Sequence, residues 1–233
     1  MPTVTLVGLG RIGSTIAQAL DAGTIPSLTL VGHIRRGTPE PDRHAALAGA
    51  DIVVEAAAAA VVPDLARSVL PQGKTLVVTS VSGLWLEPGL DQLGGRIIVP
   101  SGATLALDAL KALAFHDLRR VSACLRLPSV HAPGEVDDYR GTARDAARRF
   151  PGHANNFVAT ALALGVDDFP VEVRRDNTVE GPTVEVSVET DTAVLSARLS
   201  HRPSPAHPEV SRNIALSVLA VLRDLGSAVR VGT

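Results

Sequence analysis

Three glycines near the amino terminus constrain the fold of this chain more than any other feature. Gly8, Gly10 and Gly13 form the pattern G-x-G-x-x-G between an apolar, β-branched run at 3–7 and a helical segment that begins at Ile12. In a strand-turn-helix unit the first glycine permits a tight turn, the second lets a pyrophosphate approach the backbone, and the third lets the helix lie close to the strand. The helix then directs unpaired N–H groups at the phosphates. The pattern predicts a dinucleotide-binding turn; the alternative is a βα turn with no ligand.

The composition limits the class of protein. With 233 residues, 45% of them hydrophobic, the chain can bury a core in one or two domains. The formal net charge of -2 and the lack of a basic stripe argue against a nucleic-acid partner, which needs clustered Lys and Arg. The apolar stretch at 50–62 is short and is interrupted by Asp51 and Glu55, so we expect no membrane span.

Cysteine and histidine usage limits the chemistry further. The single cysteine, Cys124, excludes an intrachain disulfide and a cysteine-built metal site, and it favours a cytoplasmic location. Cys124 lies in a run at 120–127 that is typical of a strand, where we expect a buried, inert thiol. The seven histidines show no metal-ligand spacing, and no metal site is predicted.

The first hundred residues alternate short β-branched runs with alanine- and leucine-rich segments, as βαβ units do. This alternation predicts an α/β, Rossmann-type, doubly wound parallel sheet with its ligand crevice at the carboxyl ends of the strands. We expect strands at 3–7, 28–34, 52–55, 75–79 and 96–99, and helices at 12–22, 44–47, 62–69 and 87–93.

From Ser101 onward the pattern changes to helices mixed with antiparallel-looking strands, which indicates a second, α+β domain. The last segment, 209–225, has apolar residues at helical spacing and should pack back onto the first domain. We therefore expect a dinucleotide-binding domain at 1–100, completed by 208–233, and a second domain at 101–207. The second domain should contain strands at 120–127, 170–175, 183–190 and 193–200, and helices at 105–113, 143–150 and 156–164.

The residues after the second strand bear on the choice of nucleotide. Domains that prefer NAD usually place Asp or Glu about 20 residues past the glycines, where it binds the ribose 2′-hydroxyl. This chain has Gly32-His33-Ile34-Arg35-Arg36 instead. Arg35 and Arg36 would attract a 2′-phosphate through charge-assisted hydrogen bonds, so NADP should be accepted as well as NAD. The alternative is a solvated basic turn.

Four groups of residues, in order along nearly the whole chain, resemble the L-aspartate dehydrogenase family. They are Gly49-Ala50-Asp51-Ile52-Val53-Val54-Glu55-Ala56-Ala57; Val99-Pro100-Ser101-Gly102-Ala103 with Leu107-Asp108-Ala109-Leu110; Phe150-Pro151 with Ala154-Asn155-Asn156; and Arg202-Pro203-Ser204-Pro205 with Pro208 and Ser211.

The resemblance implies a homodimeric enzyme that oxidises the small molecule L-aspartate with NAD or NADP. The product would be iminosuccinate, which hydrolyses to oxaloacetate and ammonia and can also feed pyridine-nucleotide biosynthesis. Residues 101–207 would then form the substrate and dimerisation domain. The resemblance assigns the pyrophosphate to Gly8, Gly10, Arg11, Ile12 and Gly13, the path to the nicotinamide to Ala56, Ala57, Val81 and Ser82, and further cofactor contacts to Ala103 and Asn156.

Two of these assignments have alternatives. Spacing from Phe150 favours Asn155 for the last cofactor contact, but we prefer Asn156, because an asparagine that opens a helix is oriented by its own cap geometry. A cap without a ligand is the other interpretation. Ser101 and Gly102 could bind a substrate carboxylate at the start of the helix at 105–113, or Ser101 could serve only as the N-cap.

The resemblance also implies an acid–base histidine in a strand of the second domain, but no histidine occurs between His153 and His201. A missing general base typically costs about 10²- to 10⁴-fold in rate. His153 is the preferred replacement, ahead of His201, His207 and Glu185. The alternative is a catalytically impaired nucleotide-binding homologue that serves as a sensor or assembly partner. Signatures of reductases acting on homoserine or dihydrodipicolinate are not found.

Overall fold

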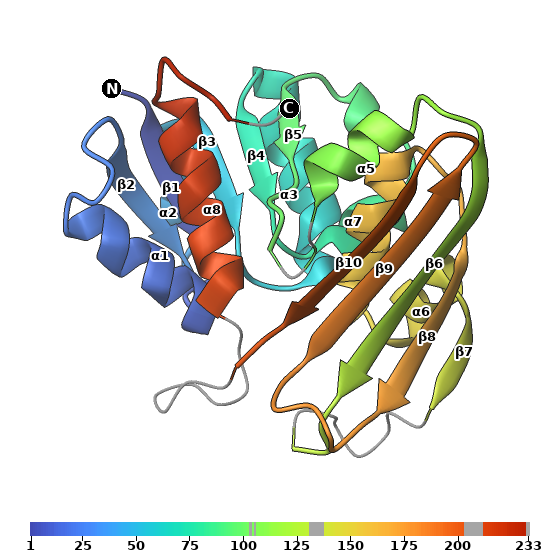
Figure 1. Cartoon of the computed structure of the whole chain (residues 1–233). Helices are drawn as coiled ribbons and strands as arrows, with labels where there is room; N and C mark the ends of the chain where they lie inside the picture. The colour runs from blue at the N-terminus through green and yellow to red at the C-terminus, as the bar shows by residue number, and fades with distance from the viewer. Residues whose placement is uncertain (103, 105, 131–137, 203–211, 232–233) are drawn as a thin grey trace. The chain divides into compact units, whose positions relative to one another are not determined.

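A computed structural model describes residues 1–102, 104, 106–130, 138–202 and 212–231 of the chain (Figure 1). The chain forms two compact units. The first comprises Met1–Gly102 and Arg212–Gly232, and the second comprises Ala103–Ser211 together with Thr233. Among the described residues, no helix is both long enough and apolar enough to cross a membrane.

A five-stranded parallel sheet forms the centre of the first unit, in the order β2-β1-β3-β4-β5. β3 is buried along its whole length and β4 along all but its first residue, as expected for parallel strands covered on both faces. The strands are β1 (Thr3–Val7), β2 (Thr29–Ile34), β3 (Ile52–Glu55), β4 (Thr75–Val78) and β5 (Arg96–Ile98).

Helices cover both faces of this sheet. On one face α1 (Arg11–Asp21) and α8 (Arg212–Leu225) share an apolar core with β1, β3 and β4 (Figure 1). The other core packs side chains from α2 (Glu40–Ala48) and α3 (Val62–Val69) against alternate residues of the same strands. The doubly wound Rossmann-type fold, with the carboxyl-terminal helix packed onto the first domain, is therefore confirmed.

The helix expected at 87–93 is wrong. β4 leads instead into a short helix, α4 (Val81–Trp85), and later into the single 3₁₀ turn η3 (Leu90–Gln92). Pro88 lacks a backbone N–H, and Gly89 has a φ of +85°. A regular α-helix cannot continue through that pair of residues. Two further 3₁₀ turns flank α3, namely η1 (Ala59–Val61) and η2 (Leu70–Gln72).

The second unit contains a mixed five-stranded sheet in the order β10-β9-β6-β8-β7. β6 and β8 run parallel, and the other neighbouring pairs are antiparallel, so the predicted α+β class is confirmed. The strands are β6 (Leu118–Leu127), β7 (Tyr139–Thr142), β8 (Pro170–Arg175), β9 (Thr183–Thr190) and β10 (Val194–Ser200), and the helices are α5 (Leu107–Leu113), α6 (Ala143–Arg149) and α7 (Asn155–Leu164).

The two faces of this sheet differ. Inward-facing residues such as Leu125, Val173 and Val186 are nearly fully buried, and α6 and α7 lie behind that face (Figure 1). The edge strand β7 was not predicted, because its four residues, which include Gly141, lack an apolar alternation. The opposite face presents polar and charged side chains.

Candidate functional site

Two of the three amino-terminal glycines are required by close backbone packing. Gly8 has a φ of +96°, and a Cβ there would lie 2.5 Å from the backbone oxygen of Ala56. A Cβ on Gly13 would lie 1.9 Å from the carbonyl oxygen of Gly8. The amide of Gly8 also donates to the carbonyl of Ile34 at 2.8 Å, and the amide of Ala56 donates to that of Val7 at 2.8 Å. The turn is thereby held against the ends of β2 and β3.

Gly10, the second glycine of the motif, faces open space. Gly10 is the N-cap of α1, and a Cβ on it would meet nothing within 4 Å. Arg11 and Ile12 begin the helix, whose first turn has neither a side-chain cap nor an acidic residue. The Ser14 hydroxyl donates to the carbonyl of Leu9 at 3.0 Å and braces the turn. Since helix N-termini attract anions, this turn fits a pyrophosphate group that approaches the backbone at Gly10.

The end of β2 carries positive charge. Arg35 and Arg36 are exposed directly after Ile34, in a turn closed by two 3.0 Å bonds between Arg35 and Thr38. Gly37 has a φ of +85° within this turn. Neither guanidinium has an ion pair or hydrogen bond within the described part of the chain. Both groups are therefore available to an anionic ligand.

A buried carboxylate joins the ends of β3 and β4. Glu55 has 0% exposure, and its Oε1 accepts hydrogen bonds from the Ala57 amide at 2.7 Å and the Ser80 hydroxyl at 2.9 Å. Its Oε2 accepts from the Ser80 amide at 2.9 Å and the Thr79 amide at 3.2 Å. Burial raises the pKa of Glu55, and these hydrogen bonds oppose that shift. All four partners are donors, so the contacts fit the ionised form.

The residues assigned to the nicotinamide path flank Glu55. Ala56 is half-buried and Ala57 is exposed after β3, whereas Val81 and Ser82 are buried in α4 after β4. β3 and β4 are paired neighbours, so the fold brings these two segments to the same edge of the sheet. Sequence reasoning placed Glu55 at the end of a strand, as an interruption of an apolar stretch and as part of the family resemblance, and assigned it no role in the site. An acidic residue that ends an otherwise apolar strand was the available signal.

Gly83 is another residue that sequence reasoning missed. A Cβ on Gly83 would lie 2.1 Å from the carbonyl oxygen of Ala59, so α4 packs its backbone against η1. This close approach holds the segment after β4 against the segment after β3.

In the second unit, Asn156 is buried without partners for its side chain. It is 2% exposed, and neither its amide nitrogen nor its amide oxygen has a hydrogen-bond partner in the described part of the chain. Its backbone oxygen accepts from the hydroxyls of Thr160 at 2.9 Å and Thr104 at 3.3 Å. Buried polar groups are rarely left unsatisfied, so this carboxamide marks a position where a further group would bind.

The reason given for preferring Asn156 is wrong. α7 begins at Asn155, and its N-cap is Ala154, with no side-chain cap bond. Neither asparagine caps the helix, so burial orients Asn156. The neighbouring assignment, Ala103, lies outside the described residues.

Ser101 is not at a helix start, contrary to prediction. α5 begins at Leu107, because its N-cap Ala106 has a left-handed φ of +55° that a right-handed helix does not adopt. Ser101 is exposed, and Gly102 has a φ of +48°. Their role as substrate contacts stays a prediction.

His153 lies in the turn between α6 and α7, three positions before Asn156. Its amide donates to the carbonyl of Phe150 at 2.8 Å, and its half-buried ring has no hydrogen-bond partner among the residues described. Burial lowers the pKa of His153, which favours the neutral imidazole. His201 is 5% exposed, and burial lowers its pKa as well. His207 lies outside the described residues.

The remaining acid–base alternative, Glu185, is engaged in ion pairs. Its carboxylate lies 3.5 Å from Arg126 and 3.6 Å from Arg198 on the exposed face of the second sheet. Glu185 is therefore held in ion pairs on an exposed sheet face, and not in the buried setting that the suggestion of a basic carboxylate required.

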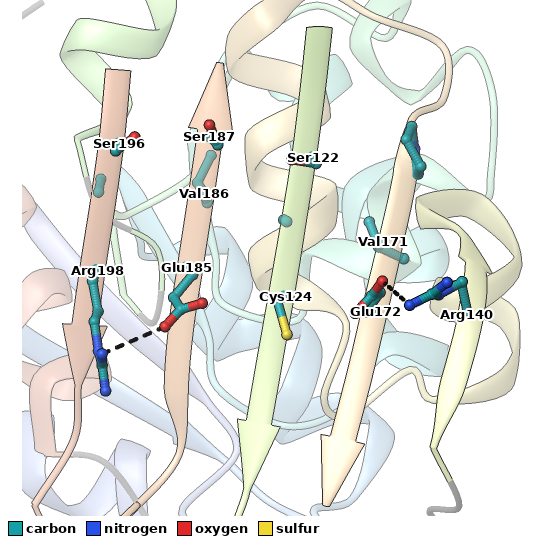
Figure 2. Close-up of a pocket in the computed structure, with 13 residues that line it drawn as sticks. Ser122, Cys124, Arg140, Val171, Glu172, Glu185, Val186, Ser187, Ser196 and Arg198 are labelled. Atoms are coloured by element: carbon teal, nitrogen blue, oxygen red, sulfur yellow. Dashed lines mark ion pairs between the residues drawn. The ribbon is translucent and has the colours of Figure 1, made fainter. Parts of the chain in front are cut away.

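A cavity of about 550 Å³ lies over this exposed face. Five of its side chains form one row across neighbouring strands, and Figure 2 shows the outer ion pairs of Arg198 with Glu185 and of Arg140 with Glu172. Cys124, at the middle of the row, is half-exposed rather than buried, because the strand alternation turns its neighbours inward. The partial burial that remains still raises the pKa of its thiol, which disfavours a reactive thiolate.

Comparison with known proteins agrees with this architecture. The family model for "Aspartate dehydrogenase, C-terminal" matches residues 108–225. L-aspartate dehydrogenase 3 of Bordetella bronchiseptica is 34% identical over 99% of this chain and 97% of its own length. L-aspartate dehydrogenase of Bradyrhizobium diazoefficiens is also 34% identical, over 99% and 94%. The crystal structure of aspartate dehydrogenase from Thermotoga maritima covers 100% of both chains with a TM-score of 0.75 at 18% identity. Full-length similarity to these relatives, together with the family match, places this chain in the aspartate dehydrogenase family.

Proposed function

We propose that this protein is an NAD(P)-dependent L-aspartate dehydrogenase. The reaction converts L-aspartate and NAD(P)⁺ into iminosuccinate, NAD(P)H and a proton; water then converts iminosuccinate into oxaloacetate and ammonia. The observation that carries the proposal is the amino-terminal turn. In this turn Gly8 and Gly13 pack directly against backbone atoms, whereas Gly10 leaves space for a ligand. The chain's membership of the aspartate dehydrogenase family supports the same function.

The first unit would supply the contacts to the cofactor. The backbone from Gly8 to Gly13, with Arg11 and Ile12 between, would hold the pyrophosphate, and Arg35 with Arg36 would hold a 2′-phosphate when NADP binds. When bound, the nicotinamide supplies the redox chemistry, because it exchanges a hydride with the substrate carbon. The walls beside it would be Ala56, Ala57, Val81 and Ser82.

His153 would handle the proton. Deprotonation of the substrate ammonium requires a base, and an imidazole kept neutral by burial can accept that proton at a ring nitrogen. Asn156 and Ala103 would be further cofactor contacts, and Ser101 with Gly102 would bind a substrate carboxylate. The unpartnered carboxamide of Asn156 supports its assignment.

Three finer features rest on the family resemblance. We propose that the protein is a homodimer, that it is cytoplasmic, and that its imine product can feed pyridine-nucleotide biosynthesis. The exposed, charged face of the second sheet is the surface we assign to dimerisation.

A second candidate function is nucleotide binding without catalysis. The absence of histidine between His153 and His201 favours it, because no histidine then occupies the acid–base position that the family resemblance implies. Such a protein would serve as a sensor or assembly partner.

Steady-state assays distinguish the two functions. Purified protein is assayed for the change in reduced-nicotinamide absorbance with L-aspartate plus NAD or NADP, and with oxaloacetate plus ammonium and NADH or NADPH. Turnover in either direction, reduced in His153→Ala, supports the dehydrogenase. Tight nucleotide binding without turnover supports the second function, and no binding of any dinucleotide contradicts both.

A further inference from the structure

We propose that Glu55 is a positioning residue that holds both walls of the nicotinamide site and whose buried charge favours the oxidised, cationic ring over the reduced one. The inference deepens the proposed function and rests on it. Everything that carries it lies within the first unit.

The positioning role follows from which segments Glu55 joins. Oε1 binds the Ala57 amide at 2.7 Å and the Ser80 hydroxyl at 2.9 Å, so one oxygen contacts both segments. Oε2 binds the amides of Ser80 at 2.9 Å and Thr79 at 3.2 Å. Ala57 follows β3, and Thr79 with Ser80 lies between β4 and α4. One side chain therefore sets the spacing between the ends of β3 and β4. The proposed nicotinamide contacts lie in the segments that follow these two strands.

These contacts require a carboxylate. Four donors converge on two oxygens, and a carboxylate accepts at both, whereas a glutamine would offer one acceptor and one NH₂ group. In Glu55→Gln, the NH₂ group would oppose a backbone N–H on one side. The Ser80 hydroxyl could turn to accept from that group, but the other three donors are backbone amides, which cannot accept a hydrogen bond.

The charge of Glu55 is not neutralised by a cation. No Lys, Arg or His forms an ion pair with it in the described ranges, and its stabilising partners are neutral amides and a hydroxyl. The field of this carboxylate therefore extends to its surroundings. The nicotinamide ring is cationic when oxidised and neutral when reduced, so a nearby fixed anion stabilises the oxidised form selectively. At an effective dielectric constant of about 20, such an interaction amounts to roughly tenfold in relative affinity.

The test compares dissociation constants for NAD⁺ and NADH in the full-length protein and in Glu55→Gln, measured by calorimetry and by nucleotide fluorescence. Because Glu55→Gln disturbs the walls and removes the charge, both forms should bind more weakly, and the ratio Kd(NAD⁺)/Kd(NADH) should rise about tenfold. Ser80→Ala is the matched control. It removes one hydrogen bond to Glu55 and keeps the charge, so both constants should rise severalfold while their ratio stays at the wild-type value.

Several outcomes overturn the proposal. If Kd(NAD⁺)/Kd(NADH) in Glu55→Gln equals the wild-type ratio, the charge effect is excluded and Glu55 has a structural role only. If Glu55→Gln does not fold, Ser80→Ala still decides the positioning role: unchanged affinity for both nucleotides refutes it. Failure of the wild-type protein to bind either nucleotide contradicts the proposed function itself, which separates that failure from failure of this inference.

Discussion

Gly13 lies so close to Gly8 that a Cβ on Gly13 would come 1.9 Å from the Gly8 carbonyl oxygen. Gly13→Ala should therefore force the helix away from β1 and lower both stability and nucleotide affinity. Gly10→Ala is the variant to compare with it, because a Cβ on Gly10 would meet nothing within 4 Å and the φ of -68° suits alanine. We expect its melting temperature to fall by only a few degrees, since the preference for Gly over Ala at an N-cap is about 1 kcal/mol.

Nucleotide titration completes that comparison. Gly10→Ala should lose at least about tenfold in nucleotide affinity, because its methyl group occupies the space through which a phosphate reaches the backbone. Wild-type affinity in Gly10→Ala would mean that the pyrophosphate binds elsewhere.

The two arginines after β2 should discriminate between nucleotides. Replacing Arg35 and Arg36 together by alanine should weaken NADP binding by about 10- to 100-fold and change NAD binding little, since hydrogen bonds to charged groups contribute roughly 1.5–3 kcal/mol. The KM values for both cofactors measure this effect. Arg119→Ala removes an exposed charge from the second unit and should alter neither value. Equal losses for NAD and NADP would contradict a 2′-phosphate site.

His153→Ala should lower kcat for aspartate oxidation by about 10²- to 10⁴-fold, the usual contribution of a general base. Burial lowers the pKa of His153 below its ordinary value of 6.5, so the reactive neutral form already predominates at that pH. The kcat of the wild-type protein should therefore decrease only below pH 6.5 as His153 becomes protonated. This decrease should be absent from the pH profile of the variant. A variant that retains the wild-type pH profile would remove His153 from the mechanism.

Asn156→Leu should separate ligand binding from stability. Because the carboxamide is buried without partners among the described residues, replacing it with an apolar group of similar size should leave the melting temperature of the free protein unchanged or higher. The additional stabilisation by saturating nucleotide should shrink in the same variant. Undiminished stabilisation by nucleotide would show that Asn156 does not contact the ligand, and Asn155→Ala provides the neighbouring control.

Asp176 should contribute to resistance against acid. Hydrogen bonds from Thr178 and a 3.1 Å bond from Arg126 lower the pKa of Asp176 from 3.8 to about 2. A carboxylate whose pKa is lower in the folded than in the unfolded protein stabilises the fold at any pH above the unfolded pKa. This stabilisation is lost as the pH falls from 3.8 toward about 2. Asp176→Asn should therefore unfold at higher pH than wild type. Exposed Asp21→Asn is the control, and identical acid transitions in all three proteins would contradict the expectation.

The errors made from sequence have specific causes. The helix expected at 87–93 failed because Pro88 and Gly89 interrupt it, and both residues were visible in the sequence. The cap assigned to Asn156 failed for another reason: a helix boundary depends on hydrogen bonds that composition places only to within a few residues. Ser101 was likewise assigned to a helix that begins at Leu107, because the left-handed backbone of Ala106 has no signal in an alanine side chain.

The positions of the buried strands along the chain could be read locally, because hydrophobic patterning and glycine chemistry depend on neighbours in sequence. β1, β3, β8 and β9 begin and end where the residue pattern predicted. The tertiary structure alone decided that Glu55 meets amide donors from residue 57 and from residues 79 and 80, and that the carboxamide of Asn156 is enclosed without a partner among the described residues. Burial and hydrogen-bond satisfaction are properties of surroundings assembled from distant parts of the chain, and no local pattern encodes them.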